Sequence, residues 1–230
     1  MAILPALQSA ALRLIGRKPT VFFGAAGNFE AEVCDWANEV AQDIAKYQDW
    51  QALQRVWTVT GDGSTTEFPL PPDYDRMLQN ASLQDLQNWA WGYSGFTDIN
   101  SFLFDQARGF TPYPGGWIIY GNQLRFSPAP QASGATFPYI SNQIATAADT
   151  SPKSAFTSDT DSFVLPERLL TLGIVWRWRE NKGLDATGDQ EAFIKALDEY
   201  AAKDKGSQIQ RFGGTRRIPN TSLAYSGIAR

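Results

Sequence analysis

The stretch LPERLLTLGIVWRWRENKG, residues 165–183, decides how the rest of the chain must fold. Pro166 fits the first turn of a helix, where its missing N–H costs little, and Gly183 is typical of the position just past a helix end. Between them, apolar residues cover most of the helix circumference instead of one stripe. A helix with this pattern is buried on nearly all sides. The sequence therefore predicts a central helix over 166–182 that needs several partner elements.

The largest partner for this helix comes from the N-terminal part of the chain. Asn28 is expected to cap a helix that runs from Phe29 to about Leu53. Its apolar residues recur at intervals of three and four, which places them on one stripe. Shorter helices are predicted from Pro5 to Ile15 and from about Thr187 to Lys205. We expect the two long helices to pack together through Phe29, Val33, Trp36, Val40, Ile44, Tyr47, Leu169, Leu172 and Trp176.

Between the helical segments the apolar period changes to two, which is typical of strands. Val56–Thr60 and Thr65–Leu70, joined by a Gly-Asp-Gly-Ser turn, are predicted to form a hairpin. The prolines at 69, 71 and 72 place the second of these strands at a sheet edge. Three further strands are expected at Trp117–Tyr120, Leu124–Phe126 and Thr136–Ile140. A short helix is expected at Asp98–Arg108.

These elements predict an α+β fold. Residues 1–54 and 151–205 would form a helical bundle, into which residues 55–150 insert an antiparallel β domain. Residues 206–230 are rich in Gly, Ser and Arg and show no period, so we expect them to form an extended C-terminal arm.

The composition argues against an enzyme. The chain has no histidine and one cysteine, Cys34, which leaves no His-based catalytic group and no usual zinc site. We therefore expect no catalytic residue, no metal and no cofactor. No stretch approaches the ~20 apolar residues that a membrane span needs, so no membrane association is expected.

Charge and aromatic content indicate a protein that binds other proteins. Residues 206–230 carry four arginines and no acidic residue, which leaves 16 basic and 24 acidic residues in 1–205. A basic segment on an acidic body suggests docking on an acidic partner. The chain also has 8 Trp, 8 Tyr and 14 Phe, and aromatic side chains are enriched at protein interfaces.

Two other functions are consistent with parts of the sequence. A cell-wall glycosidase needs two carboxylates, and Glu30, Glu32 and Asp35 lie within two helical turns of one another. The helix dipole also favours acidic residues at a helix N-terminus, which explains their position without catalysis. A glycan-binding module would need an aromatic platform on the β domain. The candidates for such a platform are Trp89, Trp91, Tyr93, Trp117 and Tyr120.

Three strings carry a resemblance to a known family. They are WTVT (57–60) with EFPLPPDYDRM (67–77), then LRFSPAP (124–130), then FVLPE (163–167) leading into WRWRENKGL (176–184). In their order and spacing, over roughly residues 25–205, they resemble the head-to-tail adaptor proteins of tailed bacteriophages, also called connector or head-completion proteins. None of these strings is a catalytic signature.

The resemblance implies a structural virion protein at the head-tail junction, made in the host cytoplasm. It implies a ring of twelve copies between the portal protein and a tail or nozzle protein, which extends the DNA channel. The genomic DNA would pass through the lumen without sequence-specific binding. We expect the C-terminal arm to dock on the portal through Arg211, Phe212, Arg216, Arg217, Ile218, Leu223 and Tyr225.

Overall fold

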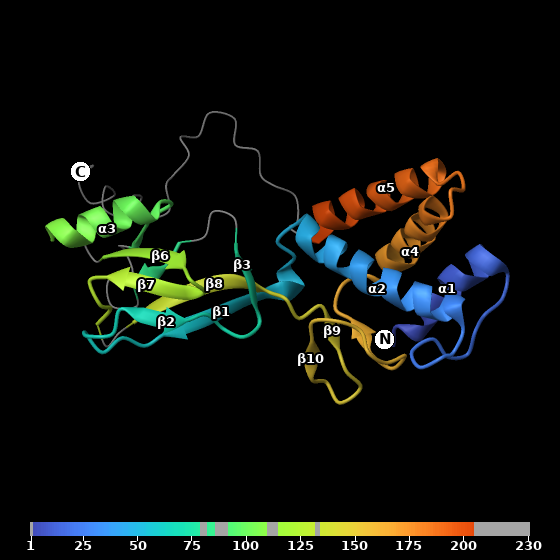
Figure 1. Ribbon diagram of the computed structural model, residues 1–230, viewed down its shortest axis with the longest axis horizontal. Helices are drawn as coiled ribbons and strands as arrows, with labels where there is room; N and C mark the ends of the chain where they lie inside the picture. The colour runs from blue at the N-terminus through green and yellow to red at the C-terminus, as the bar shows by residue number, and fades with distance from the viewer. Residues whose placement is uncertain (1, 79–81, 86–91, 110–114, 132–133, 205–230) are drawn as a thin grey trace, which may run out of the picture. The chain divides into compact units, whose positions relative to one another are not determined.

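The computed structural model describes residues 2–78, 82–85, 92–109, 115–131 and 134–204 (Figure 1). These residues form two compact units. A helical unit contains the described residues of Met1–Gln54 and Ser141–Ile209, and a β unit contains those of Arg55–Ile140. Helices lie at both ends of the chain and strands lie between them, which confirms the predicted α+β class.

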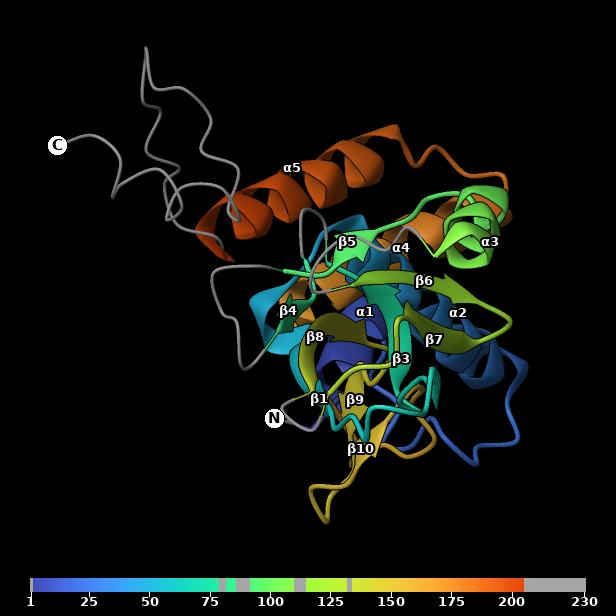
Figure 2. The same ribbon diagram turned by 90° about the vertical axis from the view of Figure 1, so that its left-hand side faces the viewer.

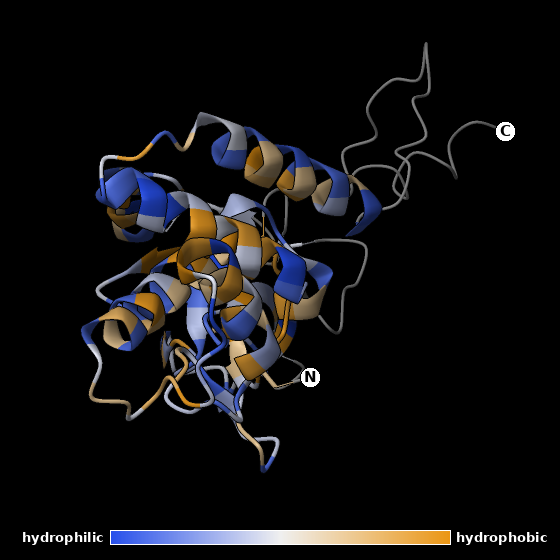
Figure 3. Ribbon diagram, turned by 90° about the vertical axis from the view of Figure 1, so that its right-hand side faces the viewer, coloured by the Kyte–Doolittle hydropathy of each residue, from blue (hydrophilic) through white to orange (hydrophobic). Residues whose placement is uncertain are grey.

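Helix α4 (Glu167–Asn181) is the centre of the helical unit. Helices α1 (Leu4–Ile15), α2 (Asn28–Tyr47) and α5 (Thr187–Asp204) all contact it. Figure 3, which faces this unit, shows hydrophobic and hydrophilic positions alternating around its helices. The prediction that α4 is buried on most sides is confirmed, because its fully covered residues point in several directions. They are Leu169, Leu170, Thr171, Gly173, Ile174 and Val175.

Helix α2 packs on α4 through smaller residues than the sequence predicts. Its buried positions are Val33, Ala37, Val40, Ala41, Ile44 and Ala45. Phe29 and Trp36 are half-buried, and Tyr47 is 49% exposed. Three of the six buried positions are therefore alanines, while the larger aromatic residues of α2 are only partly covered.

The ends of α2 also differ from the prediction. Gly27, and not Asn28, is the N-cap residue. The helix stops at Tyr47 because Gln48 takes an extended conformation. Buried Trp50 then turns back, and its indole N–H donates to the Ile44 carbonyl at 2.7 Å. This bond satisfies a carbonyl at the end of the helix, after which a 3-10 turn, η1 (Gln51–Leu53), leads into the first strand.

A buried carboxylate fixes the N-terminal helix to the helical unit. The side chain of Asp161, 1% exposed, accepts hydrogen bonds from the Lys153 ammonium at 2.9 Å and from the N–H groups of Thr157 and Ser158 at 2.8 and 3.0 Å. Its backbone carbonyl accepts from the N–H of Ile3 at 2.6 Å, next to the start of α1. The surrounding small sheet pairs β9 (Ala145–Thr146) with β10 (Pro152–Lys153) and β11 (Ser162–Phe163).

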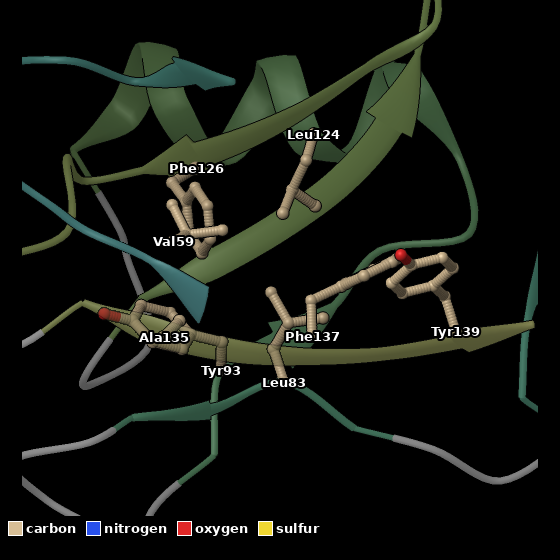
Figure 4. Packing of buried hydrophobic residues seen from close by; sticks show 8 residues of the cluster. All are labelled: Val59, Leu83, Tyr93, Leu124, Phe126, Ala135, Phe137 and Tyr139. Atoms are coloured by element: carbon tan, nitrogen blue, oxygen red, sulfur yellow. The ribbon is translucent and has the colours of Figure 1, made fainter. Parts of the chain in front are cut away.

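The β unit contains two sheets. One has the order β1 (Gln54–Val59), β8 (Ala135–Ser141), β3 (Tyr74–Met77), with β4 (Gln84–Asp85) also paired to β8. The other has the order β2 (Glu67–Pro69), β7 (Gln123–Ser127), β6 (Gly116–Tyr120), β5 (Ser94–Gly95). Helix α3 (Ile99–Arg108) packs beside β6 (Figure 2). Side chains from both sheets meet in one apolar cluster: Val59, Leu83, Tyr93, Leu124, Phe126, Ala135, Phe137 and Tyr139 (Figure 4).

The predicted hairpin over 56–70 is wrong. Strand β1 pairs with β8 and β2 pairs with β7, so the two segments belong to different sheets. The connecting loop is held by Asp62, which accepts from the N–H groups of Ser64 and Thr65 at 2.8 and 2.6 Å. Gly63 then donates to the Pro130 carbonyl at 2.9 Å, which directs the loop toward a distant part of the chain.

Other local predictions in this unit are confirmed. Strands β6 and β7 form an antiparallel hairpin across Gly121 and Asn122, whose φ angles of 60° and 59° suit such a turn. Strand β2, which contains Pro69, lies at a sheet edge as expected. Asp98 caps α3 by accepting from the N–H of Ser101 at 2.9 Å.

Two helical glycines provide a test of the packing. A Cβ at Gly173 would lie 2.3 Å from Val40 Cγ1 and 3.1 Å from the Phe193 ring, whereas a Cβ at Gly188 would meet nothing within 4 Å. We expect Gly173→Ala to lower the free energy of unfolding by about 1–3 kcal/mol through overpacking. The matched Gly188→Ala variant should be neutral or up to ~1 kcal/mol more stable. Denaturant unfolding measures both, and equal stabilities would contradict this packing.

The buried carboxylate predicts a dependence on pH. Burial raises the pKa of Asp161, but the N–H groups of Thr157 and Ser158 and the Lys153 ammonium outweigh that effect and lower the pKa below its usual range. The stabilisation is therefore present above the unfolded-state pKa of about 3.9 and is lost as pH falls through the folded-state pKa. Asp161→Asn should cost about 3 kcal/mol at pH 7.

The free energy of unfolding of the wild type and of the Asp161→Asn variant should be compared from pH 7 to pH 2.5. The difference in stability should be constant down to about pH 5 and should then narrow. Asp35→Asn, at an exposed position of α2, is the matched control and should change little at any pH. A difference that stays constant to pH 2.5 would argue against an ionised Asp161.

Candidate assembly surfaces

The charge-rich end of α4 is occupied by contacts within the helical unit. This is the WRWRENK string that contributed to the family resemblance. Its cationic side chains bind carboxylates on α2 and α5, and the pairs are Arg177 with Asp43 at 3.0 Å, Lys182 with Glu32 at 2.9 Å and Arg179 with Asp189 at 2.5 Å. The string therefore joins three helices of one chain.

The two tryptophans of the same string also contact neighbouring helices. The Trp176 ring stacks on Phe193 of α5 with centroids 5.4 Å apart, and Trp178 meets Phe29 of α2 edge-on at 6.1 Å. Among the other predicted bundle residues, Val33, Val40, Ile44 and Leu169 are buried, and Leu172 is half-buried.

The acidic residues near the start of α2 do not have the properties of a glycosidase pair. Glu32 accepts from Lys182 and from the Trp178 indole N–H, and the Lys182 hydrogen bond is the main reason why its pKa lies below the usual range. A glycosidase acid needs the opposite shift. Glu30 lies 3.9 Å from Arg17, and Asp35 is exposed.

The aromatic residues proposed for glycan stacking are divided between the interior and the surface of the β unit. Tyr93 is 4% exposed and belongs to the apolar cluster, so its ring is unavailable for stacking. Trp117 is half-buried and meets Phe137 edge-on at 6.4 Å. The ring of Tyr120 is covered by the Arg125 guanidinium at 4.1 Å. Trp89 and Trp91 lie outside the described residues.

The arm residues proposed to dock on the portal all lie outside the described residues. They are Arg211, Phe212, Arg216, Arg217, Ile218, Leu223 and Tyr225. The last described residue of α5 is Asp204, whose carboxylate accepts from the backbone N–H of Gln51 at 3.0 Å. Helix α5 thus ends beside η1.

Helix α3 presents an apolar face to solvent. Only Phe102 of this helix is buried, and its ring meets Phe96 edge-on at 5.5 Å. Ile99, Leu103 and Phe104 are 38%, 45% and 53% exposed. Neighbouring exposed apolar side chains on one helix mark an interaction surface more often than single ones do. We call Ile99, Leu103 and Phe104 the α3 face.

The α3 face was not among the predicted sites, although the sequence carries a signal for it. Ile99 and Leu103 are four residues apart and Phe104 follows directly, so a helix over this segment places them together. The Arg108 guanidinium lies over the Phe104 ring at 4.2 Å, which adds a cation to the rim of the face.

The remaining side chains offer little chemistry. Burial raises the pKa of the Cys34 thiol to about 12, helped by Asp159 and Glu30, and a protonated thiol is a poor nucleophile. In the described part of the chain, no group of three or more His, Cys, Asp or Glu residues could hold a metal ion. None of the described helices is both long and apolar enough to cross a membrane.

Adjacent residues of α3 test the assignment of its two faces. We expect Phe102→Ala to destabilise the β unit by about 3–5 kcal/mol because it removes a buried ring. Leu103→Gln should change the free energy of unfolding by less than ~0.5 kcal/mol, because Leu103 is exposed and both residues favour helix. Denaturant unfolding measures both variants. A large loss of unfolding free energy in the Leu103→Gln variant would mean that the α3 face is part of the core.

Comparison with known proteins confirms the family that the sequence strings suggested. The family model described as SU10 adaptor protein matches residues 4–219. The match begins at the first residue of α1, spans both units and continues past Asp204. No curated protein matches the chain. The chain belongs to the SU10 adaptor protein family, a family of phage head-to-tail adaptors.

Proposed function

We propose that copies of this chain form a closed ring of twelve between the portal and a tail or nozzle protein. Family membership implies a virion protein that interacts with portal and tail proteins. The observation that carries the ring proposal is the α3 face, whose three apolar side chains are exposed in the single chain. A closed ring needs a surface on each copy that binds a different surface of the next copy.

We further propose that residues 1–54 and 151–205 act as one helical domain, with residues 55–150 as an inserted β domain. The helical domain would be the rigid part of each subunit, since ion pairs and stacked rings join α2, α4 and α5. The β domain would supply contacts to the neighbouring copy through the α3 face.

The charge of the chain supports a channel that does not hold DNA. Residues 1–205 carry 16 basic and 24 acidic residues, so the body of each subunit is acidic. An acidic lumen would repel phosphates, and the genome would pass without sequence-specific binding. A structural adaptor of this kind needs no cofactor and no catalytic residue.

Residues 206–230 would be the portal-docking arm. They combine arginines with spaced apolar residues, and Gly213-Gly214 separates Arg216 and Arg217 from the part of the segment nearest α5. Arginine pairs with acidic portal residues would make the attachment sensitive to salt.

The ring proposal is tested by measuring the mass of the free protein, alone and with portal, and by electron microscopy of the mixture. We expect twelve copies per portal. Leu103→Gln should reduce ring occupancy about tenfold or more, because it places an amide in an apolar contact. Leu184→Gln is the matched control, since Leu184 is 54% exposed but lies in the loop after α4. One to three copies per portal, or equal effects of both variants, would refute the proposal.

The arm is tested separately with a chain that lacks residues 206–230. Its free energy of unfolding should match that of the full chain, while its binding to portal without DNA should be weaker and should lose its salt dependence. Equal binding by the two chains would exclude the arm. A loss of binding that requires DNA would instead identify a nucleic-acid-binding tail.

A further inference from the structure

The C-terminal end of α1 and the loop after it, dark blue in Figure 1, form an exposed basic corner of the helical unit. Residues 1–29 contain three basic residues and no acidic residue, although the whole chain has 24 acidic residues. We call this surface the α1 corner, and its exposed residues are Leu12, Arg13, Arg17, Lys18 and Val21. Leu12 and Val21 are 46% and 49% exposed, so the corner combines apolar side chains with positive charge.

Hydrogen bonds hold the α1 corner in one shape. The side-chain amide of Gln8 donates to the Pro19 carbonyl at 2.9 Å, which brings the loop back beside α1. Farther along the loop, the N–H groups of Phe22 and Phe23 donate to the Asp159 carboxylate at 3.0 and 3.1 Å. The corner is therefore pre-organised in the free chain, which lowers the entropic cost of binding a partner.

Helix α2 carries exposed negative charge that complements this corner. Asp35, Glu39 and Asp43 are exposed and follow one another at intervals of four residues, so they lie along one side of the helix. Asp43 pairs with Arg177, whereas no described cation pairs with Asp35 or Glu39, which we call the α2 stripe. Like charges four residues apart destabilise an isolated helix. Helix formation alone therefore does not account for the α2 stripe.

Helix α5 shows how a helix face that only meets water differs from the α2 stripe. Its exposed charges at 191, 195, 199 and 203 read Glu, Lys, Glu and Lys, so each has an opposite charge four residues away. Neither Asp35 nor Glu39 has a cation three or four residues away in α2. In the α1 corner, Arg17 lies 3.9 Å from Glu30, and its side chain is still 70% exposed. The helical unit thus presents two surfaces of opposite and largely uncompensated charge.

We propose that the α1 corner of one copy binds the α2 stripe of the next copy in the ring. This inference rests on the proposed ring and adds a second contact between copies to that of the α3 face. A closed ring needs two different, complementary surfaces on each chain, and opposite charges fix which surfaces meet. Leu12 and Val21 favour a protein partner over DNA, because non-specific binding to the DNA backbone is carried by charge.

Charge reversal and mixing test this pairing. One variant, Arg13→Glu with Arg17→Glu, reverses the α1 corner, and a second, Asp35→Lys with Glu39→Lys, reverses the α2 stripe. Each variant alone should reduce ring occupancy on portal about tenfold or more, because like charges then face each other. An equimolar mixture should recover wild-type occupancy, since the two variants can alternate around a ring of twelve. A chain with all four reversals should also recover.

Lys195→Glu is the matched control, because it reverses an exposed cation on α5, and it should keep wild-type occupancy. Circular dichroism checks that each variant is folded before mixing. Full occupancy by either reversed variant alone would overturn the pairing. A mixture that does not recover would also overturn it and would identify portal or DNA as the partner of the α1 corner. A wild type that forms no ring would refute the proposed function and this pairing with it, so the two failures are distinguishable.

Discussion

The helical unit depends on the close approach of α2 and α5 to α4 at Gly173. Because this residue has no side chain, Val40 and Phe193 fill the space that a Cβ would occupy. Protein interiors are packed as densely as organic crystals, so a contact of this kind fixes helix positions within a fraction of an ångström. The stacking of Trp176 on Phe193 and the ion pair of Arg177 with Asp43 both require these helix positions.

The helices were predictable because their signals are local. Gly16 follows α1 directly, Gly183 comes just after Lys182, the C-cap residue of α4, and Asp98 caps α3, as sequence rules require. The buried face of α2 was harder to predict, since Ala37, Ala41 and Ala45 carry weak apolar signals and yet are buried. Large aromatic residues such as Trp36 and Tyr47 suggested a wider buried stripe than the structure has.

The pairing of the strands was only partly predictable. The turn at Gly121-Asn122 specifies its own hairpin, whereas the Gly-Asp-Gly-Ser segment has similar composition and no hairpin. The two turns differ in their contacts, because the N–H of Gly63 donates to the carbonyl of Pro130, which lies far along the chain. The α3 face could have been found from the spacing of Ile99 and Leu103. The pairing of β1 with β8 could not, because a strand's position in a sheet is set by pairings between distant segments.

The β unit interrupts the helical unit in the sequence, and this order has consequences during synthesis. The chain leaves the helical unit after Gln54 and returns to it at Ser141, so the described residues of the β unit all come from one stretch of sequence, 55–140. The β unit can complete its apolar cluster as soon as Ile140 has left the ribosome. Helices α1 and α2 are made first but have no α4 to pack on until residues 167–181 emerge. Their apolar faces therefore stay uncovered through the translation of more than half of the chain, a period of seconds at about 5–20 residues per second. In this protein the part made first is the last to reach its native packing.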